Sequence, residues 1–146
     1  MPSYVCTTVT GRLSGGQRAR IAAILTDAHH RATGAPAYFV RVAFEEAAAG
    51  TVHIGGAPLQ HDHLFVFGHI RAGRDADIRR GLLDAISAGV RNAAALHHLG
   101  LWIYLAELPE ENMVEFGHGL PPSGVEAAWR DALPADDREW LESLGG

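Results

Sequence analysis

An internal repeat at an offset of 61 residues, the distance from Val5 to Val66, limits the folds open to this chain. The offset aligns apolar residues with apolar residues and Glu46 with Glu107, without a gap. The other aligned pairs are Tyr4 and Phe65, Val9 and Ile70, Ile21 and Leu82, Leu25 and Ile86, Val40 and Leu101, and Val42 and Ile103. A fixed period of this kind predicts two copies of one structural unit, in about residues 2–46 and 63–107.

The first copy has the pattern of a strand, a helix and a second strand. Residues 4–9 form the first strand, Ser14 is placed to cap the helix, and Gly34 is placed to end it. Residues 40–44 then alternate between apolar and other side chains, which is typical of a strand. The apolar residues at helical spacing are Ile21, Ile24, Leu25 and Ala28.

The second copy repeats this order. Residues 63–70 predict a strand, and Asp75 is a plausible cap for the helix that follows. The apolar face of that helix consists of Ile78, Leu82, Ala85 and Ile86. Leu101, Ile103 and Leu105 predict the closing strand.

Two such units predict an α/β (α+β) fold with a β-α-β-β-α-β order. A strand, helix, strand unit pairs its two strands in parallel with a right-handed crossover, so we expect a four-stranded sheet with both helices on one face. The other face would be bare, and Trp102 and Tyr104 point to it, opposite to Leu101 and Ile103. We therefore expect the chain to form a homo-oligomer that covers this face.

The remainder of the chain is predicted to be loops and short helices. Residues 107–124 are rich in proline and glycine and predict an ordered loop or hairpin. In the tail, residues 125–144 predict one or two short helices. Their expected packing side consists of Trp129, Leu133, Trp140, Leu141 and Leu144. Because 146 residues suit one core, we expect a single domain over 1–146, with 108–146 as its C-terminal tail.

Composition excludes several classes of protein. The net charge of −5 argues against a nucleic-acid binder, which needs clustered Lys and Arg. No apolar run reaches the length of a membrane span, and no secretory signal is visible, so we expect a cytoplasmic protein. The single Cys6 has no disulfide partner within the chain, and its place in an alternating segment indicates a strand residue without a catalytic role.

A metal site is not expected, although the chain has nine histidines. His61 and His63 have strand spacing, which places both imidazoles on one face. The other histidines show no recognised spacing for a third and fourth ligand of zinc.

Three features suggest acid-base chemistry on a carboxylate, and each also has a structural interpretation. Removal of Met1 would leave Pro2 with a secondary amine whose pKa neighbouring charges can shift, although many chains begin with Met-Pro for no chemical reason. Arg71 and Arg74 can hold one carboxylate bidentately or can belong to a solvated helix start. His29 lies just after the apolar face of the first helix. A histidine there can bind a ligand, or it can simply lie at the boundary between core and solvent.

The sequence resembles the cis-3-chloroacrylic acid dehalogenases of the tautomerase superfamily, nearly from end to end. The resemblance rests on segments 26–29, 70–74, 102–104 and 112–115, on Glu107 and Pro109, and on the tail with Trp129 and Trp140. Those enzymes are homotrimers of β-α-β-β-α-β subunits. The resemblance implies an active site at Pro2, His29, Arg71, Arg74, Tyr104 and Glu115, with each position holding the family's residue type.

The resemblance implies hydrolytic dehalogenation of a cis-3-haloacrylate, or water addition to a related small unsaturated carboxylic acid, without a metal or organic cofactor. Arg71, Arg74 and His29 would bind the carboxylate, Glu115 and Tyr104 would activate water, and protonated Pro2 would give a proton to carbon. One alternative is a keto-enol tautomerase of phenylpyruvate-type 2-keto acids, in which neutral Pro2 is the base. Another is a non-enzymatic binding protein on the same trimeric scaffold.

Two residues depart from the family pattern. Phe116 and His118 stand where the dehalogenases have tyrosine and arginine, which removes a hydroxyl group and a permanent charge from the loop that carries Glu115. This difference predicts inefficient dehalogenation.

Overall fold

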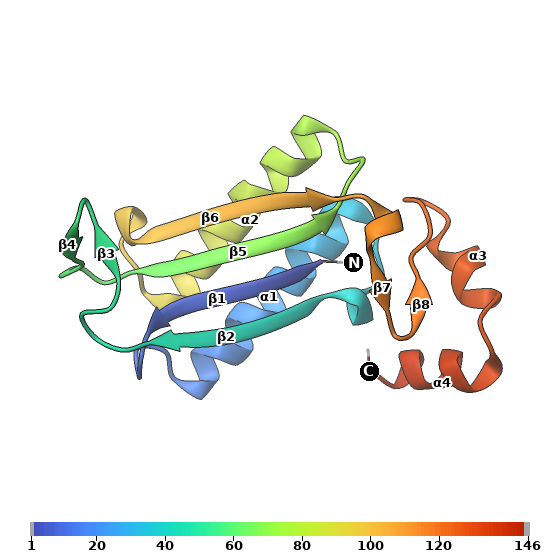
Figure 1. Ribbon diagram of the computed structural model, residues 1–146, viewed down its shortest axis with the longest axis horizontal. Coiled ribbons are helices and arrows are strands. Elements are labelled where there is room, and N and C mark those ends of the chain that lie inside the picture. The colour runs from blue at the N-terminus through green and yellow to red at the C-terminus, as the bar shows by residue number, and fades with distance from the viewer. Residues whose placement is uncertain (1, 145–146) are drawn as a thin grey trace.

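The computed structural model of the protein describes residues 2–144 and consists of a four-stranded sheet, two long helices and a set of short C-terminal elements (Figure 1). Met1, whose removal is expected, lies outside the described residues. The strand order is β2-β1-β5-β6. The strands are β1 (Ser3–Val9), β2 (Arg41–Ala47), β5 (Leu64–Arg71) and β6 (Leu101–Leu108).

The pairing of these strands confirms the predicted β-α-β-β-α-β order. β1 and β2 are parallel, β5 and β6 are parallel, and the central pair β1 and β5 is antiparallel. The helices α1 (Gly15–Thr33) and α2 (Ala76–Ala94) connect the parallel strands and both cover the same face of the sheet (Figure 1). The predicted fold class is therefore correct.

The predicted helix ends are also found. Ser14 and Gln17 form a reciprocal capping box at the start of α1, and Gly34 ends the helix in the left-handed region with a φ of 72°. Asp75 occupies the cap position of α2, but its side chain makes no capping hydrogen bond.

The core lies between the sheet and the two helices, and it explains the sequence repeat. Ile21 and Leu82 are both buried, as are Leu25 and Ile86, because each pair occupies the same place in its own unit. Cys6 is buried in this core, and burial raises the pKa of its thiol to about 12. The group therefore remains a neutral thiol at physiological pH.

The opposite face of the sheet is open (Figure 1). Trp102 and Tyr104 are exposed on it, with fractional exposures of 40% and 54%. Phe65 and Phe67 lie beside them on β5, half-buried. This face carries the bare aromatic surface that the sequence predicted.

Short elements complete the fold. Between the two units lie β3 (His53–Ile54) and β4 (Ala57–Pro58), which pair as a small hairpin. A second hairpin, of β7 (Val114–Glu115) and β8 (His118–Gly119), follows β6. Within residues 2–144 there are also three 3-10 turns, η1 (Ala37–Phe39), η2 (His98–Gly100) and η3 (Glu110–Asn112).

The tail forms α3 (Glu126–Asp131) and α4 (Ala135–Ser143), as predicted, but its packing side is smaller than expected. Leu133 and Leu141 are buried, and Trp129 is partly buried. Trp140 and Leu144 remain about half exposed, at 54% and 48%, although the Trp140 ring contacts Phe116 edge to face at a centroid distance of 5.5 Å. The helix α4 is short, and only part of its apolar surface faces the rest of the chain. Among residues 2–144, no helix is both long and apolar enough to cross a membrane.

Candidate functional site

Four of the predicted site residues line one cavity at the end of the sheet where β1 begins and β5 ends: Pro2, His29, Arg71 and Arg74. The antiparallel register of β1 and β5 explains this meeting, since Ser3 pairs with His69. Pro2, which precedes β1, and Arg71, which ends β5, therefore lie at the same edge of the sheet. The other lining residues are Ala35, Phe39, Leu120, Pro121 and Glu126. The free volume of the cavity is only about 10 Å³.

Arg71 is the most buried charged residue of the cavity, with a fractional exposure of 6%. Its Nη1 donates to the carbonyl oxygen of Pro121 at 2.7 Å, and its Nη2 forms an ion pair with Oε1 of Glu126. Its Nε is buried and has no hydrogen-bond partner among residues 2–144. The guanidinium group is thus only partly satisfied by the protein.

Arg74 approaches the same carboxylate. Its Nη2 lies 3.9 Å from Oε1 of Glu126, and its side chain is 14% exposed. Burial, and then the positive charge of Arg71, lower the pKa of Arg74, while Glu126 opposes this. The two arginines do converge on one carboxylate, as their spacing predicted, but that carboxylate belongs to the chain itself.

Glu126 was not predicted from the sequence. Burial raises its pKa, but backbone hydrogen bonds and the hydrogen bond and charge of Arg71 outweigh burial, so that the pKa is lowered overall. The carboxylate is therefore ionised at neutral pH. The sequence held no signal for this role, because a glutamate in the first turn of a helix is ordinarily explained by the helix dipole.

His29 is buried at the end of the α1 face, and its Nδ1 lies 2.9 Å from the hydroxyl of Tyr4. Burial, and then the charge of Arg74, lower the pKa of His29 to about 4. The ring is therefore neutral at physiological pH. Nδ1 is the hydroxyl's only partner within residues 2–144. The buried hydroxyl of Tyr4 therefore donates its proton to Nδ1, the acceptor within reach. Nδ1 then carries no proton, so the proton of the neutral imidazole lies on Nε2.

Pro2 is buried and lines two hollows. Its carbonyl oxygen accepts a hydrogen bond of 3.0 Å from the backbone N–H of Arg41, which fixes the start of β1 against β2. One hollow is the arginine cavity, and the other is an open hollow of about 550 Å³ whose wall includes Glu115 and Phe116. Pro2 therefore has the arginines and Glu115 around it, in two adjoining spaces.

The β7–β8 hairpin positions Glu115 beside this second hollow. Glu115 pairs with His118, and the intervening Phe116 and Gly117 both have positive φ, of 53° and 79°, as a tight type I′ turn requires. Nε2 of His118 lies 2.8 Å from Oδ2 of Asp137, which ties the hairpin to α4. The residue that departs from the family pattern at 118 thus holds the hairpin in place.

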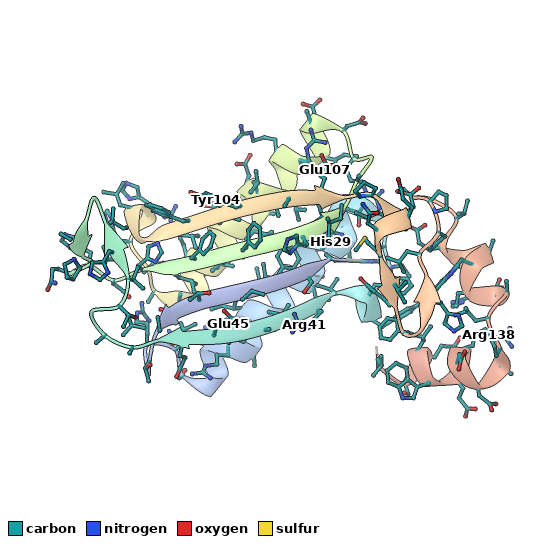
Figure 2. All side chains as sticks on the ribbon, viewed as in Figure 1. His29, Arg41, Glu45, Tyr104, Glu107 and Arg138 are labelled. Atoms are coloured by element: carbon teal, nitrogen blue, oxygen red, sulfur yellow. The ribbon has the colours of Figure 1, made fainter. Side chains whose placement is uncertain are left out.

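Tyr104 is the one predicted site residue that lines neither of these two adjoining spaces within a single chain. It lies on the open face of β6, where its ring contacts Phe65 edge to face at a centroid distance of 5.1 Å. It lines a different hollow, which it shares with Trp102. Figure 2 labels Tyr104 and His29 at separate places along the sheet.

Comparison with known proteins identifies the family. Residues 1–132 match the protein family described as "Putative oxalocrotonate tautomerase enzyme". The solved structure of N1, a member of the cis-3-chloroacrylic acid dehalogenase (cis-CaaD) family, is 33% identical, with a TM-score of 0.92 over 97% of this chain and 99% of that chain. This chain belongs to the cis-CaaD family of the tautomerase superfamily.

Other solved structures agree in fold. A "fused 4-OT wild type symmetric trimer" has a TM-score of 0.72 and 22% identity over 81% of this chain and 94% of that chain. At that identity the likeness shows the fold alone. The search of curated proteins found no match.

Proposed function

We propose that this cis-CaaD family member is a cofactor-independent enzyme that adds water to a cis-3-haloacrylate or a related unsaturated carboxylic acid, with the amine of Pro2 as the acid. The observation that carries the proposal is the position of Pro2, which lines both the arginine cavity and the hollow that contains Glu115. Removal of Met1 exposes the Pro2 nitrogen as an amine.

The arginine cavity supplies the carboxylate site. Arg71 and Arg74 hold the substrate carboxylate, and the neutral His29 donates from Nε2 to the same group. Charge-assisted hydrogen bonds to the carboxylate draw electron density from the conjugated double bond. The β-carbon of the substrate thereby becomes electrophilic.

The reaction then needs one base and one acid. Glu115 takes a proton from water as the water oxygen bonds to C3, and protonated Pro2 gives a proton to C2. The product of this addition is 3-chloro-3-hydroxypropanoate when the substrate is cis-3-chloroacrylate. Loss of chloride and of the hydroxyl proton then gives 3-oxopropanoate and HCl. The overall reaction consumes one water molecule for each substrate molecule.

We propose that the chain assembles as a homotrimer, and that Tyr104 reaches the site of a neighbouring copy. The exposed aromatic face of β5 and β6 supports this assembly, because a monomer would leave it in water. A tautomerase of the same fold is described as a symmetric trimer. A neighbouring Tyr104 would then orient the water that Glu115 activates.

A keto-enol tautomerase is the second candidate, and the charge around Pro2 favours it. Two guanidinium groups share the cavity with Pro2, and like charges lower the pKa of an amine. A neutral Pro2 would take a proton from carbon of a phenylpyruvate-type acid and return it to oxygen. Phe116 and His118, which replace the tyrosine and arginine of the dehalogenases, are consistent with this reaction.

A pair of matched variants separates these functions in protein whose intact mass shows that Met1 is absent. Glu115→Gln removes the base for water, and Glu111→Gln removes an exposed glutamate of the same segment as a control. Chloride release from cis-3-chloroacrylate is expected to fall at least about 100-fold in the first variant only. Phenylpyruvate tautomerisation that is faster than dehalogenation and unchanged in both variants would establish the second candidate. Trimeric, mature protein that turns over neither substrate would be a binding protein.

A further inference from the structure

We propose that Glu126 is a specificity-determining residue of the arginine cavity, where its carboxylate holds the position of a ligand carboxylate and must be displaced before one binds. The inference rests on the proposed function only in taking the two arginines to be the carboxylate site. It predicts a preference for small monocarboxylates over dicarboxylates.

The contacts of Glu126 show that its carboxylate is bound as a ligand would be. Oε1 forms the ion pair with Nη2 of Arg71 and lies 3.9 Å from Nη2 of Arg74. Oε2 accepts a hydrogen bond of 2.9 Å from the backbone N–H of Gly124. The side chain is only 14% exposed, so the charge is largely removed from solvent.

The remaining space is too small for a second carboxylate. The free volume of the cavity is about 10 Å³. That is about the smallest volume that holds one water molecule. A ligand carboxylate can therefore reach both arginines only if the Glu126 side chain leaves.

The contact of Arg71 with Glu126 is one that a ligand can replace. In the pair of Arg12 and Asp62, by contrast, Nε and Nη2 donate to the two carboxylate oxygens at 2.5 and 2.6 Å. Arg71 gives Glu126 only Nη2, and its buried Nε has no partner among residues 2–144. A ligand carboxylate that takes both Nε and Nη2 would gain a hydrogen bond that Glu126 does not make.

The charge of Glu126 determines which ligands the cavity binds in preference to others. Two guanidinium groups would present two positive charges, and Glu126 offsets one of them. The competition therefore weakens the binding of every carboxylate, and the repulsion from the displaced but nearby Glu126 grows with the charge of the ligand. A dicarboxylate should be rejected more strongly than a monocarboxylate of the same shape.

Direct binding tests this inference without turnover. In a Pro2→Ala background, calorimetry measures the Kd of isocrotonate, in which a methyl group replaces the chlorine of cis-3-chloroacrylate, and of maleate, the cis dicarboxylate. Glu126→Gln is expected to lower the Kd of isocrotonate at least about 10-fold, as the gain of one charge-assisted hydrogen bond allows, and that of maleate by a larger factor. Glu139→Gln, which removes an exposed carboxylate of α4, is expected to change neither Kd.

An unchanged or higher Kd in Glu126→Gln would overturn the inference, because it would show that Glu126 only supports Arg71. So would the absence of isocrotonate binding in every variant. If Glu126→Gln does not fold, Glu126→Asp keeps the charge and withdraws it by one methylene group; a lower Kd supports the inference, and an equal Kd overturns it. This test measures binding and not turnover. If the parent protein without Met1 showed no catalysis, the proposed function would be refuted, but the binding result for Glu126 would still stand.

Discussion

The hydroxyl of Tyr4 lies 2.9 Å from Nδ1 of His29, and both side chains are buried. This contact joins the first strand to the end of α1, directly behind the arginine cavity. It holds one ring nitrogen of His29 inside the core and leaves Nε2 as the nitrogen available to the cavity that His29 lines. The orientation of His29, which we propose as a carboxylate-binding residue, therefore depends on Tyr4, which does not itself line the cavity.

Tyr4→Phe is expected to weaken both stability and activity. The change leaves buried Nδ1 of His29 without a partner, which costs about 1–3 kcal/mol of unfolding free energy. The ring also loses its fixed tautomer, so kcat/KM should fall about 10-fold. Urea unfolding and steady-state kinetics measure the two effects. Parent-like values in both would show that the hydroxyl does not orient His29.

His29 should make the stability of the fold depend on pH. Its pKa is about 4 in the folded chain and about 6.5 when unfolded, so the unfolded state binds more protons between these values. Stability should therefore fall as the pH drops from about 6.5 to about 4, by at most roughly 3 kcal/mol. His29→Gln is expected to flatten this dependence in urea unfolding. A slope that is the same in the variant and the parent would contradict the assignment.

Gly68 is expected to tolerate no side chain. A Cβ there would lie 2.6 Å from Cε1 of Tyr4 and 2.8 Å from Cδ2 of Leu105. Gly68→Ala should cost about 1–3 kcal/mol through overpacking and should displace Tyr4 from His29. Gly81→Ala, at an exposed position of α2, meets nothing within 4 Å and should stabilise the fold by up to about 1 kcal/mol. Equal unfolding midpoints for the two variants would contradict the packing described.

Arg74→Ala is the variant that tests carboxylate binding with least harm to the fold. Arg71 is bonded to Pro121 and Glu126, so its loss would leave a buried carboxylate uncompensated, whereas Arg74 makes the longer contact. KM for cis-3-chloroacrylate should rise about 10- to 100-fold in Arg74→Ala. The control Arg31→Ala removes an exposed arginine whose partner is Asp27 on the same helix. An unchanged KM in Arg74→Ala would show that the arginine does not bind substrate.

Much of the fold could be predicted from the sequence because both units bury the same pattern. Ile21 and Leu82 follow the apolar spacing of a helix, and Ser14 and Gly34 mark the two ends of α1. These signals are local, because they depend on neighbouring residues in the sequence and not on distant ones. Trp140, which packs on Phe116 but remains about half exposed, shows the limit of such patterns. Its apolar character was visible, but whether a neighbour covers it depends on how a short helix lies on the rest of the chain.

The site was harder to predict than the fold, since it depends on contacts between distant segments. Spacing indicated that Arg71 and Arg74 converge, because they are three positions apart. No local pattern indicated that Glu126, 55 residues after Arg71, would meet them, or that Tyr4 would bond His29. Tyr104 marks the boundary of what one chain can show, since the role proposed for it requires a second copy.

The measurement that tests the central claim most directly compares cis-3-chloroacrylate turnover by three proteins of verified mass. These are mature parent, mature Pro2→Ala, and a chain with one serine inserted before Pro2, which keeps the ring but leaves its nitrogen in a peptide bond. Catalysis by the Pro2 amine predicts a fall of at least about 100-fold in both altered proteins. Chloride release at the parent rate in either of them would contradict it.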